Sequence, residues 1–255
     1  MNGLGVPLMT PFDGTGSVDH DALAALAAWV TDEGADFLVP CGSNSEVELL
    51  TAGERAADAG ADGSLVVTPF YYDHDQADLA AYYREVAEQS ALPVYLYSVP
   101  AYTSVELAPR TVESLATHPN IAGMKDSAGD LAAFQRTREY TAGADFELFV
   151  GSGGVFAAAL DAGGDGGILA VANVVPERAD EIAELHTAGK DEAARDVNRR
   201  ILDLNHAVTA EYGVPGLKAA MRSRDRPAGT VRSPHRPVDD DAAAELAALV
   251  GEALP

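Results

Sequence analysis

The feature that most constrains the fold is a regular alternation of short, apolar β-type runs with Ala- and Glu-rich stretches of helical periodicity. The helical stretches carry apolar residues at i, i+3 and i+4 spacing, as in Leu23, Leu26, Ala27 and Val30. Seven runs are predicted strands, at residues 5–10, 37–41, 64–70, 94–99, 121–125, 146–150 and 167–171. Because apolar strands that alternate with helices form a parallel sheet covered by helices, the pattern predicts an α/β fold.

The spacing of about 20–33 residues per strand-and-helix unit favours a (β/α)8 TIM barrel over two separate domains. We expect the barrel to occupy residues 1–175. Helices over 176–255 should pack on it within the same domain unit, with an irregular crossover at 226–237 before the last helix. Only seven strands are predicted, however, and the interval between Cys41 and Leu65 is short. A barrel with a shear of eight does not close comfortably on seven parallel strands.

Composition limits the kinds of partner. An apolar fraction of 47% in 255 residues supports a sizeable core, and the net charge of −23 is spread along the chain. Such a charge argues against nucleic acid or an anionic membrane as a partner. The excess of Asp and Glu with scarce lysine favours adaptation to high salt, where counterions screen the self-repulsion. An ordinary acidic mesophilic protein is the alternative.

The compartment is indicated by cysteine usage and hydropathy. Cys41 is the single cysteine, which excludes an internal disulfide framework and fits a reducing cytosol. The sequence has no basic-plus-apolar N-terminal segment and no apolar run approaching about 18 residues, which is the signature of a membrane span. We therefore expect a cytoplasmic protein.

A lysine and a tyrosine stand at the ends of two consecutive predicted strands. Lys125 follows the apolar run at 121–124, and Tyr97 closes the run that begins at Val94. An amine attacks a ketone only in its unprotonated form, which burial at an apolar strand end favours. A nearby phenol can carry the proton. The pair therefore indicates imine chemistry on a keto acid.

The alternative for Lys125 is a solvated cap, which is the commoner role of a lysine at a strand end. Two observations count against it: lysine occurs three times in a chain with fourteen arginines, and the residues before Lys125 are apolar. Lys190 lies in a polar turn, and Lys218 is expected to start a helix after Gly216. We therefore expect Lys125 to be the lone buried lysine.

Several motifs in this order resemble the dihydrodipicolinate synthase / N-acetylneuraminate lyase superfamily of Schiff-base aldolases, over nearly the whole chain. They are Pro7-Leu8-Met9-Thr10-Pro11-Phe12, Gly42-Ser43-Asn44-Ser45-Glu46, Thr68-Pro69-Phe70-Tyr71-Tyr72, Tyr97-Ser98-Val99-Pro100, Gly123 to Asp130, and Gly163-Gly164-Asp165-Gly166-Gly167. The resemblance implies an eight-stranded barrel. It also implies a further strand-and-helix unit between Arg55 and Ala56. The printed sequence has no residues for this unit, and we expect that the molecule itself contains them.

The resemblance implies roles for individual residues. Lys125 forms the imine with pyruvate, so that no cofactor is needed, and Tyr97 shuttles protons. Ser43 and Asn44 fall in the loop that binds the pyruvate carboxylate, where backbone N–H groups suit an anion. The hydroxyl of Ser43 also keeps the catalytic proton-relay role of the family. Asn44 replaces a hydroxyl of the family, so its amide must act as the donor. Tyr71 matches a tyrosine lent to a neighbouring subunit's site, with a core aromatic as the alternative. Further substrate-binding positions are Gly42, Gly151, Ser152 and Ile168.

Departures from the family pattern bear on the substrate. Members that condense pyruvate with aspartate semialdehyde keep an arginine at the position that matches Tyr102, and sialic acid lyases carry acids on the loop that matches 151–154. The chain has neither. Resemblance therefore points to the type that cleaves 2-keto-3-deoxygluconate or its 6-phosphate, from a halophile and assembled as a homotetramer.

Three functions remain open at this point. The first is a pyruvate-releasing aldolase of sugar-acid breakdown, of the Entner-Doudoroff kind, and the second is a 4-hydroxy-tetrahydrodipicolinate synthase. The third, a catalytically silent paralogue that acts as a binding module, is disfavoured by the intact Lys125 and Tyr97. The six histidines are scattered along the sequence, so we expect no metal.

Overall fold

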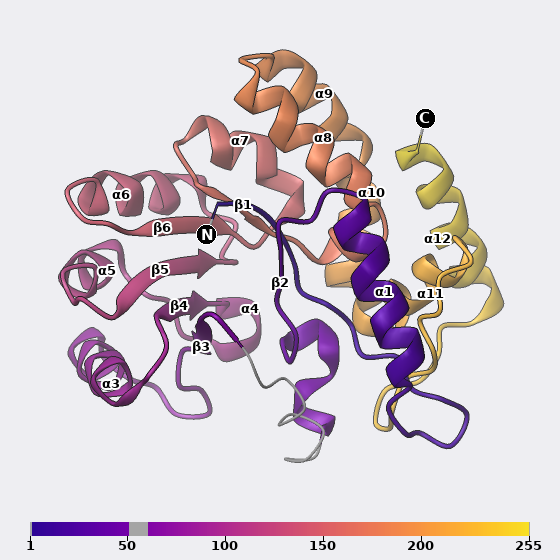
Figure 1. Cartoon of the computed structure of the whole chain (residues 1–255), viewed down its shortest axis with the longest axis horizontal. Coiled ribbons are helices and arrows are strands. Elements are labelled where there is room, and N and C mark those ends of the chain that lie inside the picture. The colour runs from indigo at the N-terminus through magenta and orange to yellow at the C-terminus, as the bar shows by residue number, and fades with distance from the viewer. Residues whose placement is uncertain (1, 51–60, 255) are drawn as a thin grey trace. The chain divides into compact units, whose positions relative to one another are not determined.

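The computed structural model describes residues 2–50 and 61–254 (Figure 1). These residues form two compact units. Unit 1 comprises Asn2 and residues 61–167, and unit 2 comprises residues 3–50 and 168–254. The chain passes from unit 1 to unit 2 within a single strand, β7 (Gly166–Ile168).

Unit 1 alternates strands with helices and turns. In chain order its elements are β3 (Ser64–Val67), α3 (Gln76–Gln89), β4 (Val94–Ser98), α4 (Pro100–Thr103), α5 (Pro109–Leu115), β5 (Ile121–Asp126), α6 (Leu131–Thr141), β6 (Glu147–Val150), η3 (Gly153–Val155), α7 (Phe156–Asp161) and the start of β7. The strands pair in the order β7-β6-β5-β4-β3, and each pairing is parallel. Helices α3, α5 and α6 follow one another along one side of these strands (Figure 1).

Unit 2 is mainly helical. Its elements are β1 (Gly3–Val6), α1 (His20–Asp32), β2 (Phe37–Leu38), the single turns η1 (Ser43–Ser45) and η2 (Val47–Leu49), then η4 (Ala170–Asn173), α8 (Pro176–Thr187), α9 (Asp191–Arg200), α10 (Leu202–His206), the π-helical turn η5 (Ala207–Glu211), α11 (Gly213–Arg222) and α12 (Asp240–Ala253). Strands β1 and β2 pair in parallel, and Leu169 N–H donates to the Gly5 carbonyl. Helix α11 packs on α12, and α8 packs on α9.

The seven predicted strands are all present, and the predicted helices after residue 176 and the irregular stretch at 226–237 are confirmed. Several strands end earlier than predicted. Strand β1 stops at Val6 and β3 at Val67, because Pro7 and Pro69 have no N–H with which to extend a ladder. The predicted insertion point between Arg55 and Ala56 lies outside the described residues.

One face of the unit 1 strands carries a cross-strand polar contact. Tyr95, Gly123 and Glu147 stand in register on β4, β5 and β6. The Tyr95 side chain passes over Gly123, and its hydroxyl donates to Glu147 Oε2 at 2.5 Å. A Cβ at Gly123 would lie 2.9 Å from the Tyr95 ring, so the contact requires glycine. Because side chains alternate along a strand, Leu96 and Met124 point to the opposite face, where both are buried.

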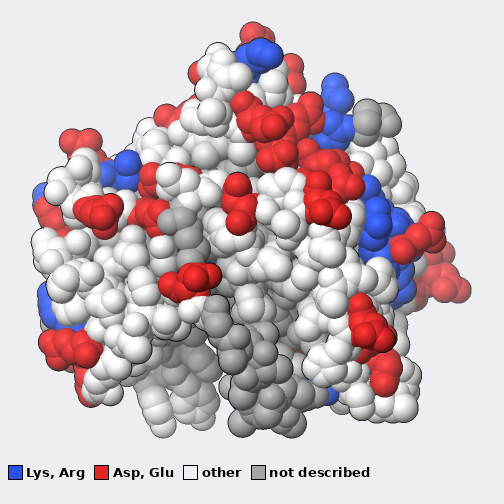
Figure 2. Space-filling model, in the orientation of Figure 1, with Lys and Arg blue, Asp and Glu red and all other residues white. Residues whose placement is uncertain are grey.

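The chain carries a net charge of −23, and one face of the molecule shows how the charged side chains are placed. Acidic side chains are spread across the visible face in Figure 2, with fewer basic ones among them. Within residues 2–50 and 61–254, no helix combines the length and the apolar character needed to cross a membrane.

Candidate active site

Lys125 and Tyr97 lie side by side at the carboxyl ends of β5 and β4. The two residues are in register, and the Lys125 Nζ lies 4.4 Å from the centroid of the Tyr97 ring. The exposed fraction is 5% for Lys125 and 8% for Tyr97, so both are buried, as predicted. Among the described residues the Lys125 amine has no hydrogen-bond or ion-pair partner. Within that part of the chain, the contact of the nitrogen is therefore with the Tyr97 ring and not with a hydrogen-bond acceptor.

Gly151 borders this pair at the end of β6. Its N–H donates to the Asp126 carbonyl at 2.6 Å. A Cβ at Gly151 would lie 1.8 Å from Ser127 Oγ and 3.0 Å from Lys125 Cε. The absent side chain of Gly151 therefore leaves the space in which Lys125 and Ser127 lie. The predicted residue Ser152 follows directly and precedes η3. Ser127 was missed by the sequence analysis, although its place two residues after Lys125 puts it on the same strand face.

Asp126 is a second buried titratable group beside Lys125, but it points the other way. Alternation along β5 sends its carboxyl to the face opposite Lys125, where Ala128 N–H donates to Oδ1 at 2.8 Å. Burial raises the pKa of Asp126 to about 6, against the lowering effect of the Ala128 hydrogen bond. Because of this orientation, Asp126 is not placed as a base for a substrate held on Lys125.

Two predicted tyrosines of unit 1 are exposed. Tyr102 lies on α4 with 65% of its surface accessible, and its pKa is raised by partial burial of the hydroxyl and by the neighbouring Tyr97. Tyr71 is 86% exposed, and the alternative that it is a core aromatic is therefore wrong. Its φ of +86° is unusual for a residue other than glycine, and such strain is found most often at binding and catalytic sites.

The predicted carboxylate-binding residues lie in unit 2. Gly42 precedes the single turn η1, which contains Ser43 and Asn44. The Asn44 Nδ2 is buried and has no hydrogen-bond partner among the described residues. An unpaired buried amide donor costs about 1–3 kcal/mol, so its presence indicates a missing acceptor. Ile168, also predicted, is buried at the end of β7, and its side chain packs beside Gly5.

Lys218 corrects the prediction of a lone buried lysine. It lies within α11, not at its start, and its side chain is fully buried. Its ammonium donates to the Thr10 carbonyl at 2.7 Å, to the Thr230 carbonyl at 2.6 Å and to Glu46 Oε1 at 2.5 Å. Burial lowers the pKa of Lys218, and the ion pair with Glu46 opposes that shift. Three acceptors saturate an ammonium group, which makes Lys218 a structural lysine.

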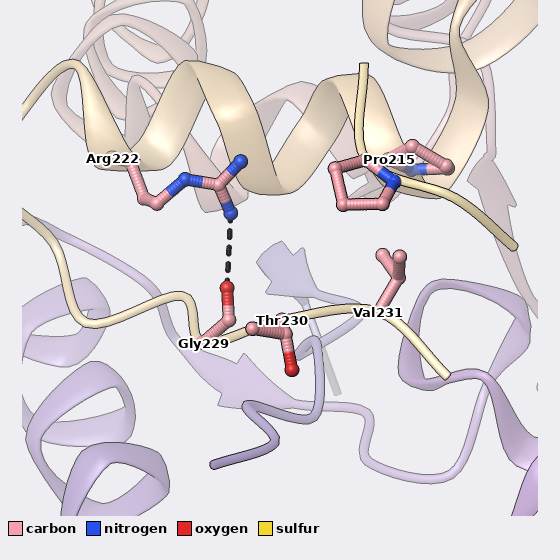
Figure 3. Close-up of a pocket in the computed structure, with 6 residues that line it drawn as sticks. Pro215, Arg222, Gly229, Thr230 and Val231 are labelled. Atoms are coloured by element: carbon pink, nitrogen blue, oxygen red, sulfur yellow. Dashed lines mark hydrogen bonds between the residues drawn. The ribbon is translucent and has the colours of Figure 1, made fainter. Parts of the chain in front are cut away.

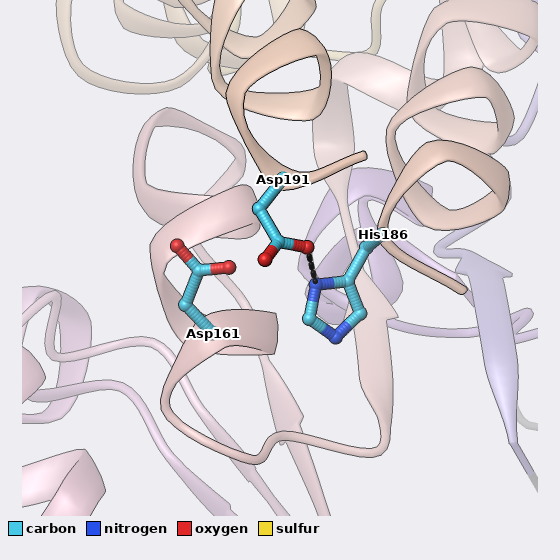
Figure 4. Close-up of side chains that lie close together, drawn as sticks. All are labelled: Asp161, His186 and Asp191. Atoms are coloured by element: carbon cyan, nitrogen blue, oxygen red, sulfur yellow. Dashed lines mark ion pairs between the residues drawn. The ribbon is translucent and has the colours of Figure 1, made fainter. Parts of the chain in front are cut away.

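Two further features contain none of the predicted site residues. A pocket of about 130 Å³ lies in unit 2, where Arg222 of α11 donates to the Gly229 carbonyl at 2.9 Å (Figure 3). Its other lining residues are Pro215, Thr230, Val231 and Pro237. At the turn between α8 and α9, His186 Nδ1 lies 3.5 Å from Asp191 Oδ1 (Figure 4). Lys190 lies exposed in that turn, as predicted.

Comparison with known sequences gives matches over nearly the whole chain. The sequence model of the dihydrodipicolinate synthetase family matches residues 39–253. An uncharacterized DapA-like lyase of Halobacterium salinarum is 34% identical over 283 positions, which cover 97% of this chain and 92% of the relative. A 4-hydroxy-tetrahydrodipicolinate synthase of Citrifermentans bemidjiense is 30% identical, with 97% of each chain covered. Because 283 aligned positions exceed the 255 residues of this chain, the alignment includes residues of the Halobacterium protein that have no counterpart in this chain.

Solved structures give the same result. The dihydrodipicolinate synthase of Thermotoga maritima is similar with a TM-score of 0.94 and 26% identity, covering 99% of this chain and 98% of that one. YagE of Escherichia coli K12, a prophage protein of the dihydrodipicolinic acid synthase family whose structure contains pyruvate, has a TM-score of 0.92 and 27% identity over the same shares. These similarities confirm the predicted α/β class with a TIM-barrel fold.

Proposed function

We propose that this chain, which belongs to the dihydrodipicolinate synthetase family, cleaves 2-keto-3-deoxygluconate or its 6-phosphate to pyruvate and glyceraldehyde or glyceraldehyde 3-phosphate. Members of this family are pyruvate-dependent lyases that bind the keto acid as a Schiff base on a lysine and need no cofactor. The reaction class, a class I aldolase or lyase, follows from the family. The sugar-acid substrate is our inference from particular residues.

The first half of the proposed mechanism forms the imine. The neutral amine of Lys125 adds to the C2 ketone of the substrate, and the carbinolamine loses water to give a protonated imine. Tyr97, whose ring lies 4.4 Å from the Lys125 nitrogen, is the proposed carrier of the protons that enter and leave. We assign the substrate carboxylate to Ser43 and Asn44, and the unpaired Asn44 Nδ2 supports this assignment.

The second half breaks the C3–C4 bond. Loss of the proton from the C4 hydroxyl releases the aldehyde, and the electron pair of the bond passes into the imine to give an enamine. Protonation at C3 and hydrolysis of the imine then release pyruvate and restore Lys125. The imine is the electron sink throughout, which is the task that a Lewis acid would otherwise perform.

The choice of substrate depends mainly on the tyrosine at position 102. By resemblance it replaces the arginine expected to bind the second carboxylate of aspartate semialdehyde adducts. Its phenol lies near Tyr97 and carries no positive charge. The loop at 151–154 also has no acidic side chain for the glycerol tail of a sialic acid. A sugar acid of small or medium size fits both observations.

Condensation of pyruvate with aspartate semialdehyde is the second candidate. It is favoured by the names of relatives such as the Citrifermentans bemidjiense synthase at 30% identity. Because a buried charge pair is commonly worth several kcal/mol when one partner is removed, cleavage of the sugar acid should exceed this condensation by at least about tenfold in kcat/KM. The test is a side-by-side assay of both reactions in molar salt. Faster turnover of aspartate semialdehyde would overturn the substrate assignment.

A variant sharpens the same comparison. Tyr102→Arg should raise kcat/KM for aspartate semialdehyde and lower it for the sugar acid, because it restores the cation. Tyr82→Arg on α3 is the matched control, since it adds the same charge at a tyrosine of unit 1 outside the predicted site. An equal effect of both variants would show that only the overall charge matters.

Covalent trapping tests the imine separately from the substrate. Borohydride with pyruvate should leave one adduct, on Lys125, and peptide mass mapping locates it. An adduct on Lys190 or Lys218, or no adduct, would refute the imine mechanism. We expect Lys218 to stay unmodified because its three hydrogen bonds hold its amine.

We also propose an oligomeric state, a compartment and a salt requirement for the protein. The exposed Tyr71 supports a subunit interface at which it reaches a neighbouring site, and by resemblance we propose a homotetramer. The net charge of −23 supports a halophilic, cytoplasmic enzyme that needs high salt to stay assembled. Sedimentation in molar salt checks this, and a fully active monomer would remove Tyr71 from the site.

A further inference from the structure

The buried ion pair between Lys218 and Glu46 joins two distant parts of the sequence within unit 2. Both side chains are fully buried, and their Nζ and Oε1 atoms lie 2.5 Å apart. Glu46 directly follows the turn η1, which contains Ser43 and Asn44. The pair therefore connects helix α11 to the turn to which we assign the carboxylate of pyruvate.

Both carboxylate oxygens of Glu46 are occupied. Oε1 accepts from Lys218, and Oε2 accepts from the backbone N–H of Arg232 at 3.0 Å. Lys218 and Arg232 therefore hold the carboxylate from two directions. The segment at 229–232 runs beside α11, as the close-up of its first residues shows (Figure 3).

The backbone at Glu46 needs such support. Its φ of +53° and ψ of +41° are left-handed, a conformation that residues other than glycine adopt at a cost. This single residue joins η1 to η2, as the C-cap of the first turn and the N-cap of the second. The next turn is held as well, because the Arg232 guanidinium donates to the Leu49 carbonyl at 2.8 Å.

Ser45, between Asn44 and Glu46, is fixed as well, because its hydroxyl donates to the Leu8 carbonyl at 2.5 Å. In contrast, the amide nitrogen of Asn44 is unpaired. The two residues that follow Asn44 are thus anchored by their side chains, while the Asn44 amide donor is left unused. This is the arrangement expected of a binding group whose neighbours keep it in place.

We infer that the Lys218–Glu46 pair is a positioning device that holds the turn at 42–46 in the conformation in which Ser43 and Asn44 bind the carboxylate of a 2-keto acid. This role rests on the proposed function of those two residues. A buried ion pair is poor evidence for stability, since apolar replacements of both partners are often neutral. Its effect here lies in where it fixes the backbone.

The test removes both charges together, because either single change would leave an uncompensated buried charge. The variant is Glu46→Gln/Lys218→Met. The matched control is Glu177→Gln/Arg224→Met, which removes a partly buried ion pair of the same unit, 2.7 Å between its atoms, that has no contact with the turn. Glu46→Asp is a third variant, which keeps the charge and shortens its reach.

Three measurements are made on each protein. Thermal unfolding is followed by circular dichroism, because the control removes Arg224, whose guanidinium lies 5.2 Å from the centroid of the Trp29 ring. Hydrogen exchange reports the amides of Ser45 and Glu46, which close η1 by bonding to the carbonyls of Gly42 and Ser43. The rate of borohydride-trapped adduct formation on Lys125 is measured against pyruvate concentration.

For the Glu46→Gln/Lys218→Met variant we expect half-saturating pyruvate to rise at least about tenfold, with the saturated trapping rate changed by less than about threefold, because carboxylate binding and not imine chemistry is disturbed. Exchange at Ser45 and Glu46 should accelerate relative to the control. Unchanged half-saturation with unchanged exchange would overturn the inference, as would equal changes in the control. If the double variant does not fold, Glu46→Asp must show the same rise.

Failure of the proposed function is distinguishable from failure of this inference. A wild-type protein that forms no adduct on Lys125 would refute the imine mechanism. The exchange rates of Ser45 and Glu46 would still decide whether the pair holds the turn.

Discussion

A methyl group at Gly151 should disable the lysine without unfolding the protein. The backbone at Gly151 is not in the left-handed region, so an alanine there is free of backbone strain. The Cβ of Gly151→Ala would nevertheless lie 1.8 Å from Ser127 Oγ, 2.9 Å from Ser127 Cβ and 3.0 Å from Lys125 Cε. Rotation of the Ser127 hydroxyl relieves only the first contact. The strand ends or the Lys125 side chain must therefore move.

The size of the effect follows from these distances. Inserting a methyl group into a packed site costs about 1–3 kcal/mol of folding free energy. A misplacement of about 1 Å at a reacting group can cost about 10²-fold in rate. We therefore expect Gly151→Ala to lower the rate of adduct formation on Lys125 by about 10²-fold while the protein remains folded.

Trapping with borohydride and pyruvate, beside thermal unfolding, measures both effects. Gly143→Ala is the matched control, because Gly143 lies in the same unit and an added Cβ there meets nothing within 4 Å. The control should keep the wild-type rate and stability. Adding Ser127→Gly to Gly151→Ala removes two of the three close contacts and should recover most of the lost stability.

A wild-type trapping rate in a folded Gly151→Ala protein would refute this reasoning. It would mean that Lys125 reaches the ketone from a side-chain position other than the one in the structure. A loss of rate in Gly143→Ala of the same size would attribute the effect to added side-chain volume in general.

Three more predictions follow from the same region. Tyr97→Phe should lower kcat by about 10²–10³ with the fold intact, because only a hydroxyl that moves protons is lost; an unchanged kcat would make Tyr97 a packing residue. Because the pKa of buried Asp126 is raised to about 6, the folded state binds its proton more tightly than the unfolded state, and the resulting stability is present below about pH 4 and lost as the pH rises through 6. The free energy of unfolding of the wild-type protein should therefore fall by about 3 kcal/mol between those pH values, and this fall should be absent in Asp126→Asn. Urea unfolding followed by circular dichroism measures it, and equal pH dependence in both proteins would contradict the assignment. Exhaustive chelation should leave activity unchanged because the imine is the electron sink, and loss of activity restored by a divalent ion would show otherwise.

The strands and the Lys125–Tyr97 pair could be predicted from the sequence because both depend on local pattern. Apolar runs bounded by glycine and proline mark strands, and parallel strands align their carboxyl ends. The register that places Tyr97 opposite Lys125 follows from that alignment. Strand lengths were overestimated, because apolar character continues past Pro7 and Pro69 while hydrogen bonding does not.

Contacts between distant parts of the sequence could not be predicted in this way. Glu46 and Lys218 are separated by 172 residues, and neither lies in a pattern that marks burial. Lys218 follows Leu217 in an amphipathic helix and reads as an ordinary helical lysine. Only the tertiary structure shows that the Thr10 and Thr230 carbonyls converge on its ammonium. Tyr71 was ambiguous for a similar reason, since exposure at the end of a strand depends on how the following loop turns.

The two buried lysines show why burial alone does not identify a nucleophile. Both side chains are buried, but the Lys218 ammonium has three oxygen acceptors, one of them a carboxylate. As long as the nitrogen keeps the three protons in those bonds, it has no lone pair with which to attack a ketone. Lys125 has no such partner among the described residues and lies beside a phenol, with the space around its side chain kept open by Gly151. From the number of acceptors around each amine, and not from how deeply each is buried, we assign the proposed imine to Lys125 and a structural role to Lys218.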